Sequence, residues 1–545
     1  MNPRLKESIE RADVVSFDIF DTLLFRVYVK PTDLFSHMER AENADGFCAE
    51  RIAAERRCRQ KNSGREDITF DDIYNEIDGK FKRLKDAELE CERRALRANP
   101  EVGEMFRFAK SIGKKVAIAS DMYLPESFLL GVLQENGFGG ADGVYISGAL
   151  NKTKSGGSLF RHILEKFGIA PGGLLHIGDN RRSDCEIPRG LGIKCHHYKK
   201  ISKRYFKKFK YLKKFYRARS GSFTASIITQ LAGARLLLEN SRGNFWRDLG
   251  YRLAGPAAFA YANFVRREAE KRNLTNLLFV ARDGYLLREI YNLCGGAAKN
   301  SYVYAPRILR YIRDMESLAP KDAKRVLDFC AAAGMSKNAG GQGGADPART
   351  SSENKALLLS KGYAENFRKY ARKFVSEGDR VGIVDTATMG FSSQDLFETA
   401  LGAPVFGLYW SNMRECARGF KFACFKPNGN YLFQEKGVFT IKWDLMEFLF
   451  SSPETSVKYV DADGSPVYAK NPPPEEVYRS EVYPDIAAGA MDFARDLLAL
   501  CGGKDPEISA DEAIECVNAY LSFPTSDDRR EMSRISHTMD FDHKE

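Results

Sequence analysis

The sequence predicts an α/β protein with a parallel, doubly wound sheet in its first part and a second α/β domain after it. Three observations predict this. Short apolar runs, each followed by a loop and a helical pattern, recur through residues 1–198. A similar alternation resumes after about residue 240, and a strongly basic segment separates the two parts. Such alternation is typical of parallel sheets covered by helices, and 545 residues are too many for one core.

Within residues 1–198, four apolar runs are short enough to be buried strands. A charged, mostly helical insert at about 32–110 lies between the first two of them, and it is too long to be a loop. We therefore expect a small helical subdomain inside the first domain. The predicted strands are Val14–Phe17, Val116–Ala119, Val144–Ile146 and Leu174–Ile177.

We expect a basic helical linker at 199–240, a second α/β domain at 241–484 and a helical tail at 485–545. A glycine-rich, polar stretch at 338–354 predicts a mobile loop inside the second domain. The predicted strands of that domain are Asn276–Ala281, Arg380–Val384 and Val405–Trp410.

The charge and the cysteines bound the class of protein. The net charge is +10, but residues 199–219 hold eleven Lys and Arg and no acid, so the rest of the chain is near −1. No run approaches the roughly 18 apolar residues that span a bilayer, and the N-terminal residues lack the apolar core of a signal peptide. Eleven cysteines without a C-x-x-C pair favour a reducing compartment. We expect a cytoplasmic protein.

Chemically active side chains follow the predicted strands of the first domain. Because the carboxyl ends of parallel strands meet at one edge of the sheet, where ligands bind, these side chains are expected to lie together. Any one of them alone is more simply a cap or a turn residue, but four such stretches in this order favour a site. They are Asp18 and Thr22, Ser120, Lys154, and the pair Asp179 and Asp184.

These residue types fit phosphoryl transfer. An aspartate carboxylate can attack phosphorus and form an acyl phosphate. The transferring group is anionic and needs cations beside it. Asp179 and Asp184 offer the hard oxygen ligands that Mg²⁺ prefers. Lys154 would neutralise a phosphate oxygen, and the hydroxyls of Thr22 and Ser120 would hydrogen-bond the others.

The four stretches resemble the four motifs of the haloacid dehalogenase (HAD) superfamily: FDIFDTL, IASD, the Lys154 stretch and IGDNRRSD. The resemblance covers about residues 12–198 and implies a HAD-like Rossmannoid sheet, with the helical insert as a C1 cap that closes over the site. It implies Asp18 as nucleophile. It also implies that Asp18, Asp179, Asp184 and the main-chain carbonyl of Phe20 hold Mg²⁺.

Phe20 departs from the family pattern, because phosphatases of this superfamily carry an acid/base aspartate at that position. Three interpretations stay open. Asp21 or a cap carboxylate performs the proton transfer; the leaving group needs no proton, as with a sugar diphosphate or an anhydride, or the acceptor is another alcohol; or the site is a degenerate, phosphate-binding scaffold. Related dehalogenases also carry an aromatic residue there, but they need no metal, and the intact GDNRRSD stretch argues against that chemistry.

The basic segment 199–219 has apolar residues at helical spacing, with Lys and Arg on the other faces. Such a helix could lie on an anionic membrane surface, follow a soluble polyanion, or pack its apolar stripe on a domain. With no base-reading module in the sequence, nucleic acid is the least supported partner. The stripe is Ile201, Tyr205, Phe209, Leu212 and Tyr216.

The second half has strand-end acids of its own. FVARDGYLL places Arg282 and Asp283 after one predicted strand, and VGIVDTATMGFSS places Asp385 after another, before a helix. Backbone amides at such a helix start suit phosphate, and a buried, capped turn is the structural alternative. The turn after Asp385 weakly resembles the diphosphate loop of phosphoribosyltransferases, one residue short and without its second acid. The three residues are candidates for a second site.

The two-part layout resembles large HAD-type proteins found with bacterial surface-polysaccharide genes. The resemblance implies a Mg²⁺-dependent phosphohydrolase or phosphotransferase acting on a small phosphorylated substrate, a sugar phosphate or a nucleotide sugar. Two alternatives remain. The chain could be a weakly catalytic scaffold that binds phosphate ligands at the inner membrane face, or a transferase whose activity lies in the second domain.

Overall fold

The structure is a computed structural model that describes residues 1–238, 244–306, 308–309, 362–388, 391–412, 419–426, 443–504 and 506–535. The glycine-rich stretch predicted at 338–354 lies outside these residues. The chain forms two compact units. Unit 1 comprises Met1–Gly243 with Asp496–Pro506, and unit 2 comprises Asn244–Arg495 with Glu507–Glu545.

The sheet of unit 1 is parallel throughout and has the strand order β5-β4-β1-β6-β7. The central strand β1 is buried along its whole length, as its apolar sequence requires. The four strands predicted for this unit are confirmed, and the polar edge strand β7 was not predicted because it lacks an apolar run. The strands are β1 Val14–Phe17, β4 Lys115–Ser120, β5 Gly143–Ile146, β6 Leu174–Gly178 and β7 Lys194–His197.

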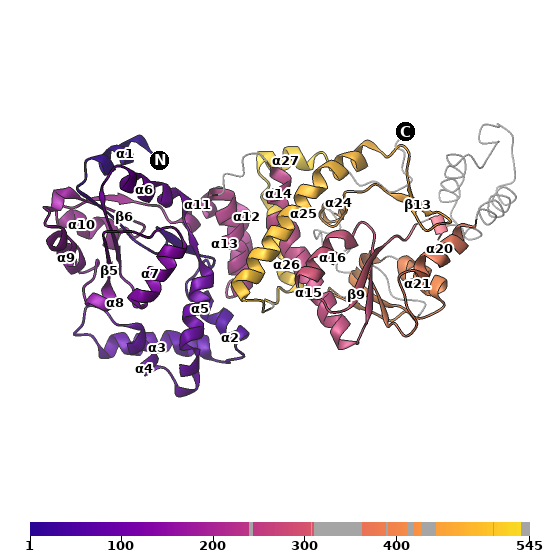
Figure 1. Cartoon of the computed structure of the whole chain (residues 1–545), viewed down its shortest axis with the longest axis horizontal. Helices are drawn as coiled ribbons and strands as arrows, with labels where there is room; N and C mark the ends of the chain where they lie inside the picture. The colour runs from indigo at the N-terminus through magenta and orange to yellow at the C-terminus, as the bar shows by residue number, and fades with distance from the viewer. Residues whose placement is uncertain are drawn as a thin grey trace. The chain divides into compact units, whose positions relative to one another are not determined.

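Helices cover the sheet of unit 1 (Figure 1). One core cluster packs Leu159, Phe160 and Ile163 of α9 on residues of β1 and β4. A π-helical turn, Arg182–Glu186 (η3), follows β6 and leads into α10. The helices outside the insert are α1 Pro3–Glu10, α6 Pro100–Ser111, α7 Glu126–Glu135, α8 Ser147–Leu150, α9 Ser158–Phe167 and α10 Ile187–Gly190.

The predicted helical insert is present between β1 and β4. A short antiparallel pair, β2 Leu24–Arg26 and β3 Leu96–Ala98, brackets it. Helix α6 lies beyond this pair and packs on the sheet, with Phe106 against Phe17 at 5.7 Å between ring centres. The insert therefore ends near Ala98, not near residue 110. Its helices are α2 Asp33–Ala41, α3 Phe47–Lys61, α4 Phe70–Glu76, η1 Gly79–Leu84 and α5 Lys85–Ala95.

The basic segment forms two helices, α11 Ile201–Lys208 and α12 Lys210–Ala218, joined at Phe209, and α13 Phe223–Leu238 follows. Four of the five residues of their apolar stripe are buried, Tyr205 completely, and Tyr216 is half-buried. A Cβ on Gly233 of α13 would lie 2.5 Å from the Tyr205 ring, so glycine permits this close contact. The stripe thus packs inside unit 1, the third of the arrangements considered for it.

The described strands of unit 2 form a second parallel sheet in the order β12-β11-β10-β8-β9. The three strands predicted for this half are confirmed, so both halves have the predicted α/β class. A small hairpin, β13 Val457–Val460 and β14 Pro466–Tyr468, accompanies the sheet. The strands are β8 Asn276–Val280, β9 Lys299–Val303, β10 Val381–Thr388, β11 Phe406–Asn412 and β12 Phe422–Cys424.

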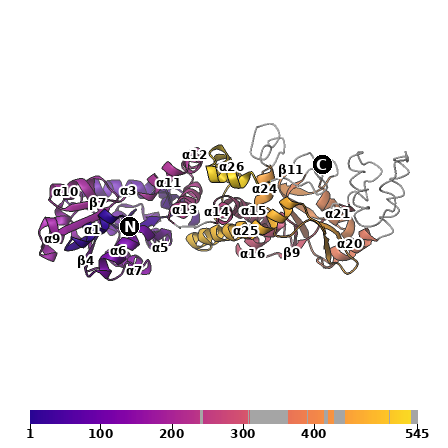
Figure 2. The same cartoon turned by 90° about the horizontal axis from the view of Figure 1, so that it is seen from above.

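Helix α25, Pro474–Cys501, lies beside α14 and α15 in both views (Figures 1 and 2). A Cβ on Gly489 would lie 1.9 Å from the Arg247 carbonyl oxygen. The helical tail expected from residue 485 therefore begins within α25. None of the helices in the described residues is both long and apolar enough to cross a membrane. The other helices of unit 2 are α14 Phe245–Leu249, η4 Gly250–Ala254, α15 Gly255–Lys271, α16 Gly284–Leu293, α20 Tyr363–Arg372, α21 Ser392–Leu401, α24 Trp443–Leu449, α26 Ala510–Ser522 and α27 Ser526–Met532.

Candidate active site

The residues predicted for the first site meet at the carboxyl edge of the unit 1 sheet. Asp18 directly follows β1, Asp179 follows the neighbouring β6, and Asp184 belongs to η3. Lys154 lies in the turn before α9. One oxygen of each of the three carboxylates lies within 4.8 Å of the other two. Residues as far apart in sequence as 18 and 184 thus form one cluster.

Lys154 holds this cluster together. Its Nζ lies 2.6 Å from Oδ1 of Asp18 and 2.7 Å from Oδ1 of Asp184. The Lys154 side chain is 3% exposed and Asp184 is completely buried. Burial by itself lowers the pKa of Lys154, but the carboxylates of Asp18 and Asp184 raise it above its ordinary value, so the ammonium stays charged. A charged lysine is fixed beside the carboxylate of Asp18.

Asp184 is oriented by further donors. The amide of Asn180 donates to its Oδ2 at 2.8 Å, and Nε2 of His176 lies 3.3 Å from its Oδ1. Nδ1 of His176 lies 2.5 Å from the hydroxyl of Ser16. Burial raises the pKa of Asp184, but Lys154 and His176 hold it well below its ordinary value. His176 was not predicted from the sequence, because it lies inside a predicted strand and carries no motif of its own.

The other two carboxylates lack sufficient positive charge. Burial, with Asp184 and Asp179 nearby, raises the pKa of Asp18 to about 8 against the opposing effect of Lys154. Burial and the charge of Asp21 raise the pKa of Asp179 to about 7. Crowded, buried oxygen ligands of this kind fit a hard divalent cation, which would return both carboxylates to the charged form. The donor set therefore suits Mg²⁺.

Two hydroxyls complete the edge. Ser120 is the last residue of β4 and is 2% exposed. Thr22 is completely buried, and its Oγ1 has no hydrogen-bond partner among the described residues. An unsatisfied buried hydroxyl is costly unless a ligand completes it, and a phosphate oxygen is the ligand that this site suits.

Asp121, also missed in the sequence analysis, fixes the lysine loop. Its carboxylate accepts from the backbone amides of Lys154 at 2.6 Å and Ser155 at 3.1 Å. The motif IASD contains this residue directly after Ser120, so its place beside a predicted site residue was the available signal.

Phe20 and Asp21 have distinct surroundings. The Phe20 ring is 9% exposed, and the Arg26 guanidinium lies over it at 4.1 Å from the ring centre. Arg26 is itself paired with Glu92 of α5 at 2.6 Å. Asp21 has a left-handed backbone with φ of 56°, and its carboxylate accepts from Nζ of Lys200. Lys200 directly precedes α11, and no motif predicted its presence here.

The second group of candidates lies at the carboxyl edge of the unit 2 sheet. Asp283 precedes α16, and its carboxylate accepts from the hydroxyl of Thr386 in β10. Asp385, next to Thr386, accepts from the Ser393 hydroxyl at 3.1 Å. The structure therefore brings Asp283 and the part of β10 that holds Asp385 together, but β10 continues to Thr388, so Asp385 lies within the strand and not after it as predicted.

Arg282 has a left-handed backbone with φ of 72°, and its guanidinium donates to Ser456 at 3.3 Å. Burial, Asp385 and Glu447 raise the pKa of Asp283 to about 8. Asp283 is thus largely a neutral acid near pH 7, hydrogen-bonded to a hydroxyl. That these residues form a second site stays a prediction.

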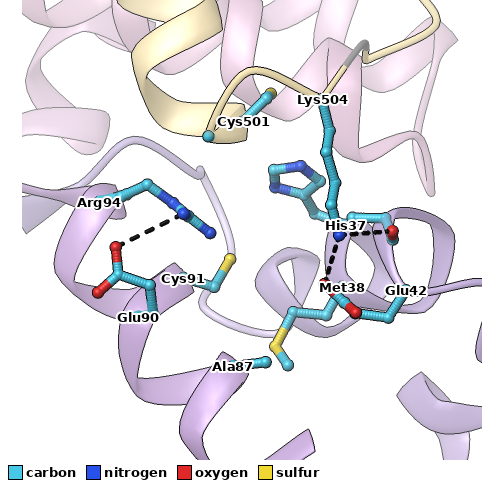
Figure 3. Close-up of a pocket in the computed structure, with 11 residues that line it drawn as sticks. His37, Met38, Glu42, Ala87, Glu90, Cys91, Arg94, Cys501 and Lys504 are labelled. Carbon is cyan, nitrogen blue, oxygen red and sulfur yellow. Dashed lines mark hydrogen bonds and ion pairs between the residues drawn. The ribbon is translucent and has the colours of Figure 1, made fainter.

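A separate cavity of about 230 Å³ lies in unit 1, away from the residues of the predicted site (Figure 3). His37, Cys91, Arg94, Cys501 and Lys504 are among its lining. Lys504 is paired with Glu42 at 2.7 Å. Burial, together with Arg94 and Lys504, lowers the pKa of His37 to about 4. This cavity holds a neutral histidine between cations.

No family model matches the chain, and no curated protein does. Solved structures similar to it include a HAD family enzyme from Bacteroides thetaiotaomicron (16% identity, 35% of this chain and 94% of that one, TM-score 0.27). A HAD phosphatase from Thermococcus onnurineus is also similar (20%, 34% and 84%, TM-score 0.24), as is a 2-haloacid dehalogenase from Pseudomonas syringae pv. tomato DC3000 (14%, 34% and 86%, TM-score 0.27).

Proposed function

We propose that unit 1 is a HAD-type phosphohydrolase or phosphotransferase that works through an aspartyl phosphate on Asp18. One observation carries the proposal: buried Lys154 bridges Asp18 and Asp184, with Asp179 within ligand distance of both. A purely structural ion pair needs one carboxylate. Three carboxylates around one lysine, with Asp18 and Asp184 buried and Asp179 half-buried, leave negative charge that a divalent cation would balance.

Each residue has a role in this proposal. Asp18 attacks the phosphorus, and Lys154 neutralises a phosphate oxygen beside it. Thr22 and Ser120 hydrogen-bond the remaining oxygens. Asp18, Asp179, Asp184 and the Phe20 carbonyl would hold Mg²⁺, which supplies positive charge to the phosphate. Asp121 and His176 act as positioning residues through Lys154 and Asp184.

For the substrate we propose a small phosphorylated metabolite, a sugar phosphate or a nucleotide sugar, in surface-polysaccharide synthesis. This part of the proposal is supported by the resemblance in sequence layout. Most apolar side chains of α11 and α12 pack inside unit 1, so lysines and arginines form much of the exposed surface of these helices. These exposed cations support peripheral contact of the protein with an anionic surface. A scaffold that binds phosphate without turnover is the second candidate, and Phe20 is the observation that favours it.

The test is phosphate release from p-nitrophenyl phosphate and a panel of sugar phosphates and nucleotide sugars. Purified protein is assayed with Mg²⁺, with a chelator, and as Asp18→Asn. Asp13→Asn, at the opposite end of β1 and exposed, is the matched control. We expect metal-dependent turnover in the wild type and in Asp13→Asn, and no turnover in Asp18→Asn. Absence of turnover, with phosphate still raising the melting temperature, would establish the scaffold.

A further inference from the structure

Two lysines at the candidate active site differ in their exposure and in the carboxylate that each contacts. Lys154 is 3% exposed and contacts the nucleophile. Lys200 comes from the basic segment, its side chain is 25% exposed, and it contacts Asp21. Asp21 in turn acts electrostatically on Asp179. Lys154 is therefore the cation for the phosphoryl group under attack, and Lys200 is a cation nearer the solvent side.

The position that carries the acid/base residue in the family pattern is occupied by Phe20. Phe20 offers only a ring there, and Arg26, held by Glu92, covers that ring. The neighbouring carboxylate, Asp21, is engaged by the ammonium of Lys200. At this position the described residues thus offer a ring and an ion-paired carboxylate, beside a nucleophile and two cations.

Leaving groups differ sharply in their need for that acid. An alcohol, like water with a pKa of about 16, must be protonated as it departs, and general acid help is typically worth about 10²–10⁴ in rate. A phosphate has a second pKa of about 6 and can depart as an anion. A phosphate leaving group instead needs a cation beside it, and Lys200 is the second lysine near this site.

We propose that the substrate is a phosphoanhydride with a terminal phosphate, such as a nucleoside diphosphate or a sugar diphosphate, and that Lys200 binds its second phosphate. The inference rests on the function proposed above and narrows it. Lysine has three donors, so Lys200 can keep Asp21 while it binds a phosphate oxygen. Three exposed lysines of α11 follow Lys200 in the sequence: Lys203, Lys207 and Lys208.

The chemistry balances without an acid. An Asp18 carboxylate oxygen bonds to the terminal phosphorus, and the bond from that phosphorus to the bridging oxygen breaks. The electron pair stays on the bridging oxygen, which leaves as part of the second phosphate beside Lys200. Water then attacks the aspartyl phosphate; the bond between phosphorus and the Asp18 oxygen breaks, and the water proton passes to a phosphate oxygen. The products are inorganic phosphate and the shortened substrate.

The first test compares three probes in the full-length protein with Mg²⁺: ADP, glycerol 3-phosphate and p-nitrophenyl phosphate. The last has a stable leaving group and reports on Asp18 alone. We expect kcat/KM for ADP to exceed that for glycerol 3-phosphate by at least about 10²-fold. Equal values for the two would overturn the inference. Failure of p-nitrophenyl phosphate itself would instead overturn the proposed function.

The second test isolates Lys200. In Lys200→Met we expect KM for ADP to rise about tenfold to 100-fold, as for loss of a charge-assisted hydrogen bond, with KM for p-nitrophenyl phosphate changed less than twofold. Lys200→Arg keeps the charge and should stay near the wild type. Lys203→Met, an exposed lysine on α11 three positions after Lys200, is the control. Equal effects on both probes, or no effect on ADP, would show that Lys200 is only structural.

Discussion

Both sheets of this protein carry an aspartate in the loop after a strand, but the two carboxyl groups have different partners. In unit 1, Asp18 at the end of β1 lies 2.6 Å from a buried ammonium. In unit 2, Asp283 after β8 accepts from a threonine hydroxyl. Both groups have a pKa raised to about 8 by burial and by neighbouring acids. The difference is in the contacting group. Among the described residues, the ammonium of Lys154 contacts Asp18, whereas the hydroxyl of Thr386 contacts Asp283.

A strand-end aspartate therefore does not define a phosphoryl-transfer site by itself. Asp18 has a cation, further carboxylates and an unsatisfied hydroxyl, which together fit a metal and a phosphate. Asp283 is largely neutral near pH 7 because its carboxyl group is protonated. The charge that surrounds a carboxylate, more than its place in the fold, decides which chemistry it can support.

The largest expected effect tests the cation. Lys154→Met leaves Asp18 and Asp184 buried without their partner, and breaking a buried pair in this way costs about 3–5 kcal/mol. We also expect phosphate release to fall at least about 10³-fold. Chemical denaturation followed by hydrogen exchange of β1 and β4 peptides measures the stability. Because Mg²⁺ can replace part of the lost charge, it should stabilise the variant more than the wild type; equal Mg²⁺ effects would contradict this account.

The next effect concerns Asp283. Its folded pKa of about 8 exceeds the unfolded value of 3.8, so the unfolded state loses its proton first as pH rises, and stability falls between about pH 4 and 8. Asp283→Asn removes this loss. We expect the free energy of unfolding of the variant to exceed that of the wild type by about 3 kcal/mol at pH 8 and to be similar to it near pH 4. The expected difference is smaller than the full pKa shift implies, because the side chain is partly exposed.

Tryptophan fluorescence can measure this change, since Trp246, Trp410 and Trp443 all belong to unit 2. Urea unfolding at several pH values gives the difference directly. A wild type that is more stable than Asp283→Asn throughout this range would show that the carboxylate is charged and paired in the folded state.

A third effect belongs to the unit 1 cavity. The folded pKa of His37, about 4, lies below its unfolded value of 6.5. The unfolded state therefore gains a proton first as pH falls, and stability is lost between about pH 6.5 and 4, by about 3 kcal/mol at most. In His37→Gln this acid sensitivity should largely disappear, although the hydrogen bond to Tyr28, 2.6 Å in the wild type, is altered. Hydrogen exchange of α2 at pH 7 and 5 tests it; an unchanged pH dependence would exclude His37.

The smallest effects compare matched helix caps. Thr69 and Ser509 each form a capping box, at the start of α4 in unit 1 and α26 in unit 2. Replacing either by Ala should cost about 1 kcal/mol. If each unit unfolds by itself, only Ser509→Ala shifts the tryptophan transition. A shift of equal size in Thr69→Ala would mean that the two units unfold together.

Local sequence was sufficient for much of the fold. The apolar runs that became β1, β4, β6, β8 and β10 are buried strands whose composition identifies them. Boundaries that depend on packing were less predictable. Helix α6 has the same charged, helical pattern as the insert before it, and only the contact of Phe106 with Phe17 assigns it to the sheet. The basic segment likewise breaks at Phe209, where packing overrides a continuous periodicity.

By itself, the sequence determined the class of fold and which residues form the cluster of the candidate site, Asp18, Lys154, Asp179 and Asp184, because strand-end loops of a parallel sheet must meet at one edge. Only the tertiary structure decided which charges meet. It placed His176 on Asp184 and Lys200 on Asp21, contacts between side chains 8 and 179 positions apart. Electrostatic energy depends on distance and burial in three dimensions, and neither is written in the local pattern of residues.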